Sequence, residues 1–336
     1  MSNALFMIGE QRSGSNLLRL MLGQADEIAA PHPPHILDRM MPLLPIYGDL
    51  DRQGNFVTLI DDVCRLVERN PVPWENITRF DRDEVISRCR QNSLFAVFGA
   101  LMDMYAKANG KEKWLCKSMT SIKYAKDLES YFGDPKYIYL YRDGRDVTLS
   151  FTKAVIGDKH PYAIAQKWAE LQRLCLSEKA HAPEQVYGVC YEALTAEPEP
   201  VLRGLCQFLG VQFKPEMLSG HLSAEAQLTS MASSLWANLS KPIMRNNSQK
   251  FLKGLSEAEI RIIESVAWDC LDALGYARVF VPRGEEEQFG ASEIEMFNAE
   301  NRSLMQQYQE EIDPEDHRRR KYQMQVLEEI KARALI

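Results

Sequence analysis

Apolar runs alternate with amphipathic stretches along this chain, and the alternation predicts an α/β fold. The continuous apolar run at residues 4–8 indicates a strand buried on both faces, and helical apolar spacing begins at Ser15. Further strands are expected at residues 113–116, 136–141 and 186–190, with helical patterns between them. Such alternation forms a parallel sheet with right-handed crossovers, so we expect a single domain with a central parallel sheet flanked by helices.

Residues 36–110 carry a mostly helical pattern, clearest at residues 56–69 and 94–108. We interpret this segment as a helical subdomain inserted beside the sheet, where it contacts substrate. Its apolar side chains near the start suit an apolar acceptor, and core packing explains them equally well: Met40, Met41, Leu43, Leu44 and Tyr47.

The C-terminal third is predicted to be irregular over residues 221–248 and then helical. Ser256 and Glu259 form a capping-box pattern, and the helix that they start is expected to end at Gly275. Beyond Pro282 two charge-rich helical stretches follow. We therefore expect a domain at residues 1–280, including the 36–110 insertion, and a helical extension at residues 281–336.

The last predicted helix carries one apolar stripe, made of Tyr322, Val326, Leu327 and Ile330. A stripe of this kind needs a surface to cover it. We expect it to pack against the main domain or a second subunit, so a homodimer is one expected assembly.

Composition narrows the class of protein. The chain has 336 residues, 45% hydrophobic and 26% charged, as in ordinary globular proteins. The formal net charge of −7 argues against a nucleic-acid partner. The seven cysteines include no C-x-x-C pair, so neither a disulfide framework nor a zinc site is expected. We find no signal peptide or transmembrane segment, and expect a cytoplasmic protein.

The first strand leads into a loop suited to phosphate. Gly9 and Gly14 bound it, and the helix that follows turns its N-terminal N–H groups and positive dipole toward an anion. The spacing is that of a P-loop, yet Ser15 and Asn16 stand where NTPases have Lys and Ser or Thr. The loop instead contains Arg12. It is therefore predicted to hold a phosphate without the NTPase lysine and magnesium ligand.

Three cations follow the expected strands at equivalent places. Arg12, Lys117 and Arg142 each come just after a strand, and the carboxyl ends of parallel strands share one edge of the sheet. This shared placement favours an anion site at that edge. Two histidines, His32 and His35, lie on the proline-rich connector that leaves the first helix.

These blocks resemble the sulfotransferases that use 3′-phosphoadenosine 5′-phosphosulfate (PAPS). The run from Arg12 to Leu18 is similar to the family's 5′-phosphosulfate loop, and Arg142 to Ser150 is similar to its 3′-phosphate motif. Two later blocks are also similar, one starting at Tyr191 and one at Gln249-Lys250-Phe251. The likeness covers residues 4–277 in order.

The resemblance implies PAPS as donor, the bisphosphate PAP as product, and no required metal. It implies nucleotide contacts for a group of residues along these blocks: Arg12, Ser13, Gly14, Ser15, Asn16, Arg142, Ser150, Tyr191 and Lys250. Arg12 and Lys117 are the expected stabilisers of the charge that develops on the bridging oxygen. The acceptor is expected to be a hydroxyl of a small molecule, lipid or peptide.

The general base departs from the family's patterns. Met119 stands where cytosolic members carry a histidine, and Pro33 stands where protein-tyrosine sulfotransferases carry a glutamate. Neither side chain accepts a proton. An imidazole suits the task at neutral pH, so His35 is ranked first and His32 second.

Two other functions stay open at this point. A P-loop kinase of small molecules would need a lysine two residues beyond Ser13, which is absent. A nucleotide-binding protein without catalysis would explain Met119, although Arg12 and Lys117 argue against it.

Overall fold

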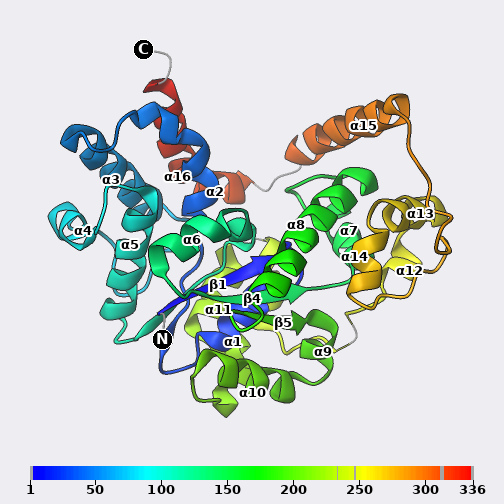
Figure 1. Cartoon of the computed structure of the whole chain (residues 1–336), viewed down its shortest axis with the longest axis horizontal. Coiled ribbons are helices and arrows are strands. Elements are labelled where there is room, and N and C mark those ends of the chain that lie inside the picture. Colours follow the sequence, from blue (N-terminus) through cyan, green and yellow to red (C-terminus); the bar gives the residue numbers. More distant parts are fainter. Residues whose placement is uncertain (1–2, 233, 246, 311–313, 334–336) are drawn as a thin grey trace.

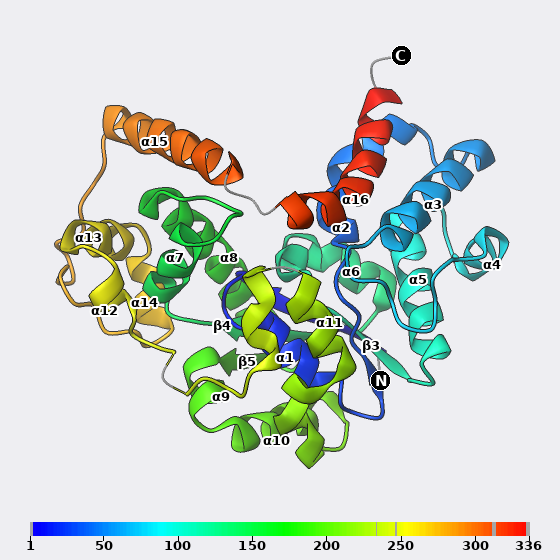
Figure 2. The same cartoon turned by 180° about the vertical axis from the view of Figure 1, so that it is seen from behind.

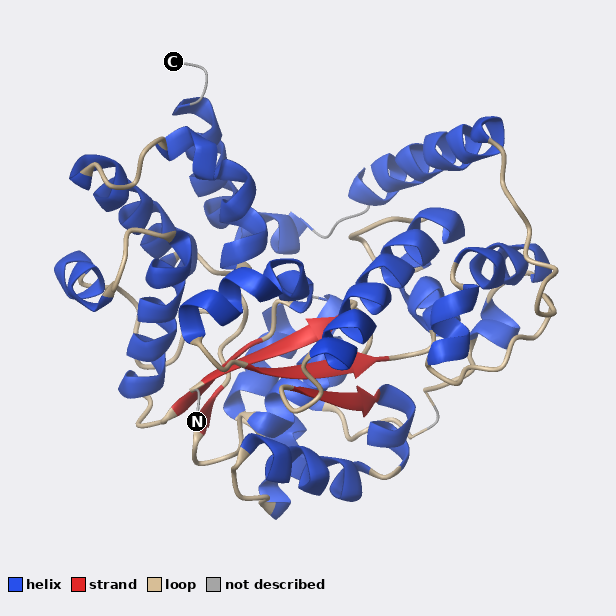
Figure 3. Ribbon diagram, viewed as in Figure 1, coloured by secondary structure: helices blue, strands red, loops and turns tan. Residues whose placement is uncertain are grey.

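The computed structural model describes residues 3–232, 234–245, 247–310 and 314–333. Five parallel strands form its sheet in the order β2-β3-β1-β4-β5 (Figure 3). Their bounds are β1 Ala4–Gly9, β2 Ile28–Ala29, β3 Lys113–Cys116, β4 Lys136–Tyr141 and β5 Val186–Cys190. The predicted fold class is confirmed, and the short strand β2 is an addition to it.

The central strand β1 is buried along its whole length. In its pairing with β3, Ala4 lies opposite Trp114. In its pairing with β4, Leu5 lies opposite Lys136 and Gly9 lies opposite Leu140. Because successive side chains of a strand point to opposite faces, β1 contributes to two separate cores. Phe6 and Ile8 belong to one, whereas Leu5 and Met7 belong to the other.

Helices cover both faces of the sheet (Figure 1). The face of Leu5 and Met7 packs against α1 (Ser15–Leu22), α10 (Pro198–Leu209) and the 3-10 helix η3 (Pro215–Leu222). The face of Phe6 and Ile8 packs against α6 (Ala125–Phe132) and the helical insertion, which includes α5 (Leu94–Ala108). The first half of the chain contains α1 Ser15–Leu22, α2 Ile36–Met40, η1 Met41–Tyr47, α3 Gln53–Glu68, α4 Arg82–Arg88, α5 Leu94–Ala108, η2 Met119–Tyr124, α6 Ala125–Phe132 and α7 Gly144–Thr152.

The second half contains α8 Pro161–His181, α9 Tyr191–Ala196, α10 Pro198–Leu209, η3 Pro215–Leu222, α11 Ala224–Ala232, η4 Ser234–Ser240, α12 Phe251–Gly254, α13 Glu257–Val266, α14 Trp268–Ala273, α15 Ala291–Glu310 and α16 Pro314–Ala332. The predicted capping box of Ser256 and Glu259 is present at α13.

Three local predictions were wrong. The segment expected to be irregular contains α11 and η4, and the signal overlooked was Ser223, whose hydroxyl accepts a hydrogen bond from the N–H of Ala226. The helix expected to run to Gly275 breaks at Ala267, which leaves the helical conformation and separates α13 from α14. Val57, which belongs to the apolar pattern expected over residues 56–69, is exposed in α3.

The last helix, α16, lies beside α2 and α3 in both views (Figures 1 and 2). Val326, Leu327 and Ile330 are buried in the core of the helical insertion, whereas Tyr322 remains more than half exposed. Polar contacts also tie the helix down, because Gln323 Nε2 donates to the carbonyl oxygen of Leu66 at 3.0 Å. The C-terminal helix is thus part of the same core as the insertion.

Candidate active site

The loop between β1 and α1 closes around the first turn of α1. Gly14 caps the helix with φ of 90°, a conformation that favours glycine. A Cβ atom there would lie 2.5 Å from the ring of Tyr191, so only glycine leaves room for this side chain. Two polar atoms near the turn, Ser13 Oγ and Asn16 Oδ1, are buried without a hydrogen-bond partner among the described residues. The loop therefore offers unused polar groups at a helix N-terminus.

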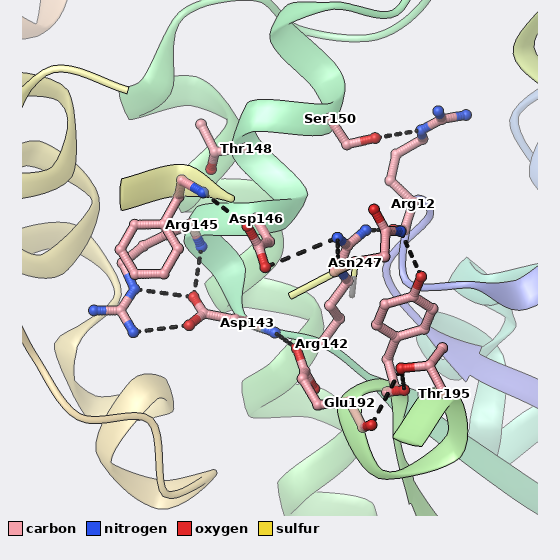
Figure 4. Close-up of polar contacts among 12 residues, drawn as sticks. Arg12, Arg142, Asp143, Arg145, Asp146, Thr148, Ser150, Glu192, Thr195 and Asn247 are labelled. Atoms are coloured by element: carbon pink, nitrogen blue, oxygen red, sulfur yellow. Dashed lines mark hydrogen bonds and ion pairs between the residues drawn. The ribbon is translucent and has the colours of Figure 1, made fainter. Parts of the chain in front are cut away.

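Arg142, immediately after β4, holds this loop from the side (Figure 4). Its guanidinium donates to the carbonyl oxygens of Arg12, at 3.0 Å, and Asn247, at 2.8 Å. It also lies 4.5 Å from the centroid of the Tyr191 ring, whose hydroxyl accepts from Asn247 Nδ2 at 2.6 Å. The Nε atom of Arg142 is buried and has no partner in the described chain.

Arg12 and Ser150 meet above this cluster. Arg12 Nε donates to Ser150 Oγ at 3.0 Å, across 138 residues of sequence. Burial, and then the charge of Arg142, lower the pKa of Arg12. The two guanidinium groups therefore raise the positive potential at the loop, which an anion would relieve.

The middle of the Arg142–Ser150 motif stabilises the fold instead of facing the loop. Arg145 forms ion pairs with Asp143 at 2.8 Å and with Glu264 at 2.6 Å, and all three side chains are buried. Glu264 also accepts from the main-chain N–H groups of residues 279–281. This cluster joins α7 to α13 and holds the helix that presents Ser150.

A cavity of about 670 Å³ lies beside the loop. The predicted nucleotide contacts that line it are Arg12, Gly14, Ser15, Asn16, Arg142, Ser150, Tyr191 and Lys250. Ser13, also predicted, does not line it and is fully buried. The sequence reasoning missed further lining residues, among them Lys153, Trp236, Lys241 and Asn247. Trp236 and Lys241 lie in the segment wrongly expected to be irregular.

A second cavity, of about 350 Å³, shares Arg12, Ser15 and Asn16 with the first and therefore meets it at the loop. His32, His35 and Lys117 line it. The structure thus brings all four predicted catalytic side chains, those of Arg12, His32, His35 and Lys117, to the lining of one cavity.

Lys117 follows β3 and is 8% exposed. Burial, and then the charges of Arg19 and Arg12, lower its pKa to about 7. No carboxylate among the described residues forms an ion pair with it. The site therefore holds a lysine whose charge depends on what binds there.

The two histidines differ in their surroundings. His35 begins α2 with φ of 56°, and its Nδ1 lies 3.3 Å from Ser118 Oγ and 3.8 Å from Asp38 Oδ2. His32 is buried, and its Nδ1 lies 3.2 Å from Asn70 Nδ2 while its ring meets Trp236 edge-on. Burial, and next the charge of Lys117 for His35 and of Arg19 for His32, hold the pKa of each well below its usual value. Both rings are therefore neutral at physiological pH.

Comparison with known proteins identifies the group to which the chain belongs. A family model described as "Sulfotransferase family" matches residues 4–215. The chain belongs to the sulfotransferase family. Among solved structures, the sulfotransferase domain from the curacin biosynthetic pathway is 23% identical, with a TM-score of 0.60 over 83% of this chain and 99% of that one. The sulfotransferase domain of the Synechococcus PCC 7002 olefin synthase is 22% identical, with a TM-score of 0.52 over 79% and 94%.

Curated relatives are similar over part of their length. A putative protein-tyrosine sulfotransferase of Caenorhabditis briggsae is 25% identical over 54% of this chain and 67% of its own. Protein-tyrosine sulfotransferase 2 of Gallus gallus is 23% identical over 64% of this chain and 53% of its own. An uncharacterized Aquifex aeolicus protein is 25% identical, and the match spans 26% of its length.

None of the helices in the described part of the chain has the length and apolar character that crossing a membrane requires. The sulfotransferase family supports transfer of a sulfuryl group in general.

Proposed function

We propose that this sulfotransferase moves a sulfuryl group from PAPS to a hydroxyl group of an acceptor. The observation that carries the proposal is the meeting of two cavities at Arg12, Ser15 and Asn16. The larger cavity contains the cationic nucleotide candidates, and the smaller contains Lys117 and two neutral histidines. Donor and acceptor would therefore approach each other at the phosphate loop.

The residues present suit a nucleotide with separate 5′ and 3′ phosphates. The loop from Arg12 to Asn16 offers main-chain N–H groups, and the hydroxyl of Ser15, which lines the cavity, for the 5′ side. Arg142 and Ser150 offer a guanidinium, with its free Nε, and a hydroxyl for the 3′-phosphate. Tyr191 and Lys250, which line the same cavity, are proposed as further contacts.

When bound, PAPS supplies the sulfuryl group, and its bond between sulfur and the 5′-phosphate oxygen breaks as the acceptor oxygen bonds to sulfur. Arg12 and Lys117 stabilise the negative charge that grows on the bridging oxygen. Such a contact is typically worth about 3–4 kcal/mol of transition-state stabilisation. The remaining gain comes from holding the two reactants in line.

His35 is proposed to take the proton of the acceptor hydroxyl. Its Nδ1 faces Ser118 and Asp38, so a proton there leaves Nε2 free to accept another. In His32 the Nδ1 faces the amide nitrogen of Asn70, which also points at the carbonyl oxygens of His32 and Val72. That arrangement places the proton of His32 on Nε2, which makes it the poorer base.

The acceptor is proposed to be a small-molecule, lipid or peptide hydroxyl. Relatives named as protein-tyrosine sulfotransferases support a peptide among these acceptors.

The test is transfer of labelled sulfate from PAPS to a panel of phenols, alcohols and tyrosine peptides, with titration of PAP in parallel. We expect sulfated product and saturable binding of PAP, each unchanged by magnesium. Absence of PAP binding would refute the proposal. Phosphorylation of the panel by a nucleoside triphosphate with magnesium would establish a kinase in its place.

A further inference from the structure

The smaller cavity contains more positive charge than the proposed transfer uses. Its described lining includes four basic side chains and one carboxylate: Arg12, Arg39, Lys117, Arg320 and Asp38. Asp38 already accepts a hydrogen bond from Thr120. Arg12 and Lys117 have a role at the sulfuryl group, whereas Arg39 and Arg320 have none in that transfer.

Arg39 and Arg320 also lack a carboxylate partner among the described residues. Arg39 Nη1 and Arg320 Nη2 are buried with no hydrogen bond, and neither guanidinium has an ion pair with a carboxylate of the described residues. Burial, and then the charge of Arg320, lower the pKa of Arg39 to about 10, so that it is still charged at neutral pH. Two half-buried cations, each with a buried nitrogen and no carboxylate in an ion pair with it, are costly to maintain. An anion between them would offset that cost.

The two guanidinium groups come from two helices that are far apart in the sequence, α2 and α16. Arg39 lies in α2 one turn after His35, since its N–H donates to the carbonyl oxygen of His35 at 3.1 Å. Arg320 lies in α16, with its guanidinium 5.7 Å from the ring centroid of Trp236. The buried face of α16 fixes that helix on the insertion. Both positions are therefore set by packing.

We infer that the acceptor carries an anionic group of its own, a carboxylate or a phosphate, which binds between Arg39 and Arg320 while its hydroxyl faces His35. The inference rests on the proposed function for the role of the hydroxyl. Side chains one helical turn apart lie about 5–6 Å from each other, so the anion and the hydroxyl are separated by about that distance or slightly more.

Two features of the cavities favour this assignment. Neither Arg39 nor Arg320 lines the larger cavity, so the phosphates of the nucleotide have their own cations. The apolar side chains considered for acceptor contact do not line the smaller cavity either, and Met40 and Tyr47 are buried in the core. The smaller cavity therefore offers the acceptor two cations that the nucleotide does not use.

The test uses probes that differ in charge: 4-hydroxyphenylacetate, its neutral amide, and 4-hydroxybenzylphosphonate. Binding of each is measured by calorimetry on the full chain, with and without saturating PAP. Charge-assisted contacts to two arginines predict that the carboxylate binds about 10- to 100-fold more tightly than the amide. The phosphonate arm shows whether the pocket prefers a carboxylate or a phosphate-like group.

Arg39→Gln and Arg320→Gln should each lower the affinity for the charged probes toward that of the amide. Arg52→Gln and Arg318→Gln are matched controls, because these arginines are 80% and 72% exposed and should leave the preference intact. Equal binding of charged and neutral probes by the native protein would overturn the inference. A loss of PAP affinity in Arg39→Gln and Arg320→Gln would also overturn it, since both would then serve the donor.

The experiments can refute the anion site and the proposed sulfuryl transfer independently of each other. If PAP does not bind but the charge preference persists and depends on Arg39 and Arg320, the anion site stands and the proposed function is refuted. If sulfate is transferred and the preference is absent, the function stands and the anion site is refuted.

Discussion

Lys117 should take up a proton when the nucleotide binds. Its pKa of about 7 in the free protein results first from burial and then from two neighbouring cations, so at pH 8 about nine-tenths of the lysines are neutral. A bound anion favours the charged form and raises this pKa. If the raised value exceeds about 9.5, binding of PAP at pH 8 takes up nearly 0.9 proton at this site.

The coupling between PAP binding and protonation of Lys117 determines whether PAP affinity rises or falls with pH. Because the complex holds the proton more tightly than the free protein, PAP affinity should fall as pH rises above 7. The fall should approach tenfold per pH unit, up to the pKa of the complex. Below pH 7 Lys117 is already charged, and its contribution to this slope disappears.

Calorimetry at pH 8 in buffers of different ionisation enthalpy measures the uptake directly. The same measurement on the Lys117→Gln variant serves as the comparison, because this variant retains the other titrating groups near the site. Lys159, with its pKa lowered to about 8 chiefly by burial, still donates to the carbonyl oxygens of Phe151 and Ile156 in that variant. The difference between the two proteins therefore reports Lys117. Equal uptake in both would refute the reasoning and place the bound anion away from Lys117.

Four further outcomes follow from the site. Arg142→Ala should weaken PAP binding about 10- to 100-fold and binding of adenosine 5′-phosphate much less, and equal losses in a titration would place Arg142 elsewhere. EDTA should leave sulfate transfer intact, because fixed cations replace the metal; loss of transfer restored by magnesium would contradict this. Gly14→Ala should lower stability and PAP affinity together in thermal and binding assays, since its Cβ would meet the Tyr191 ring. His35→Ala should lower kcat by about 10²–10⁴-fold with PAP affinity nearly unchanged, and a comparable loss in His32→Ala alone would reverse the ranking.

Much of the fold could be predicted because its strands are short apolar runs buried on both faces. Every strand predicted from such a run is present, and Gly210 ends α10 in the left-handed conformation expected of a C-terminal glycine. The strand β2 has two residues, too few to form a pattern. The break at Ala267 cannot be seen in the sequence either, because the buried apolar residues Ile260 and Ile263 of α13 and Cys270 and Leu271 of α14 keep a helical spacing across it.

The site residues that could be predicted from the sequence are those that directly follow the end of a strand. Arg12, Lys117 and Arg142 could be grouped because parallel strands share one carboxyl edge. Asn247 and Trp236 could not, since their approach depends on how a distant segment folds back over the loop. Arg320 was beyond reach for the same reason. Arg320 lies in α16, and the apolar stripe of this helix predicts that it packs against another surface. The sequence does not identify that surface as the helical insertion.

The order of residues after α1 places the proposed base, His35, and the proposed anion contact, Arg39, on one short segment. His35 has the positive φ that starts α2, and this turn points the chain so that Arg39 follows one helical turn later along the same cavity. A rigid helix start therefore fixes the distance between a proton acceptor and an anion contact. Lengthening the segment by one residue between them would rotate Arg39 by about 100° around the helix and remove it from the cavity. In our proposal, the spacing of His35 and Arg39 sets the distance between the hydroxyl and the anionic group of the acceptor, so the position of that charge is the property that the binding experiments test.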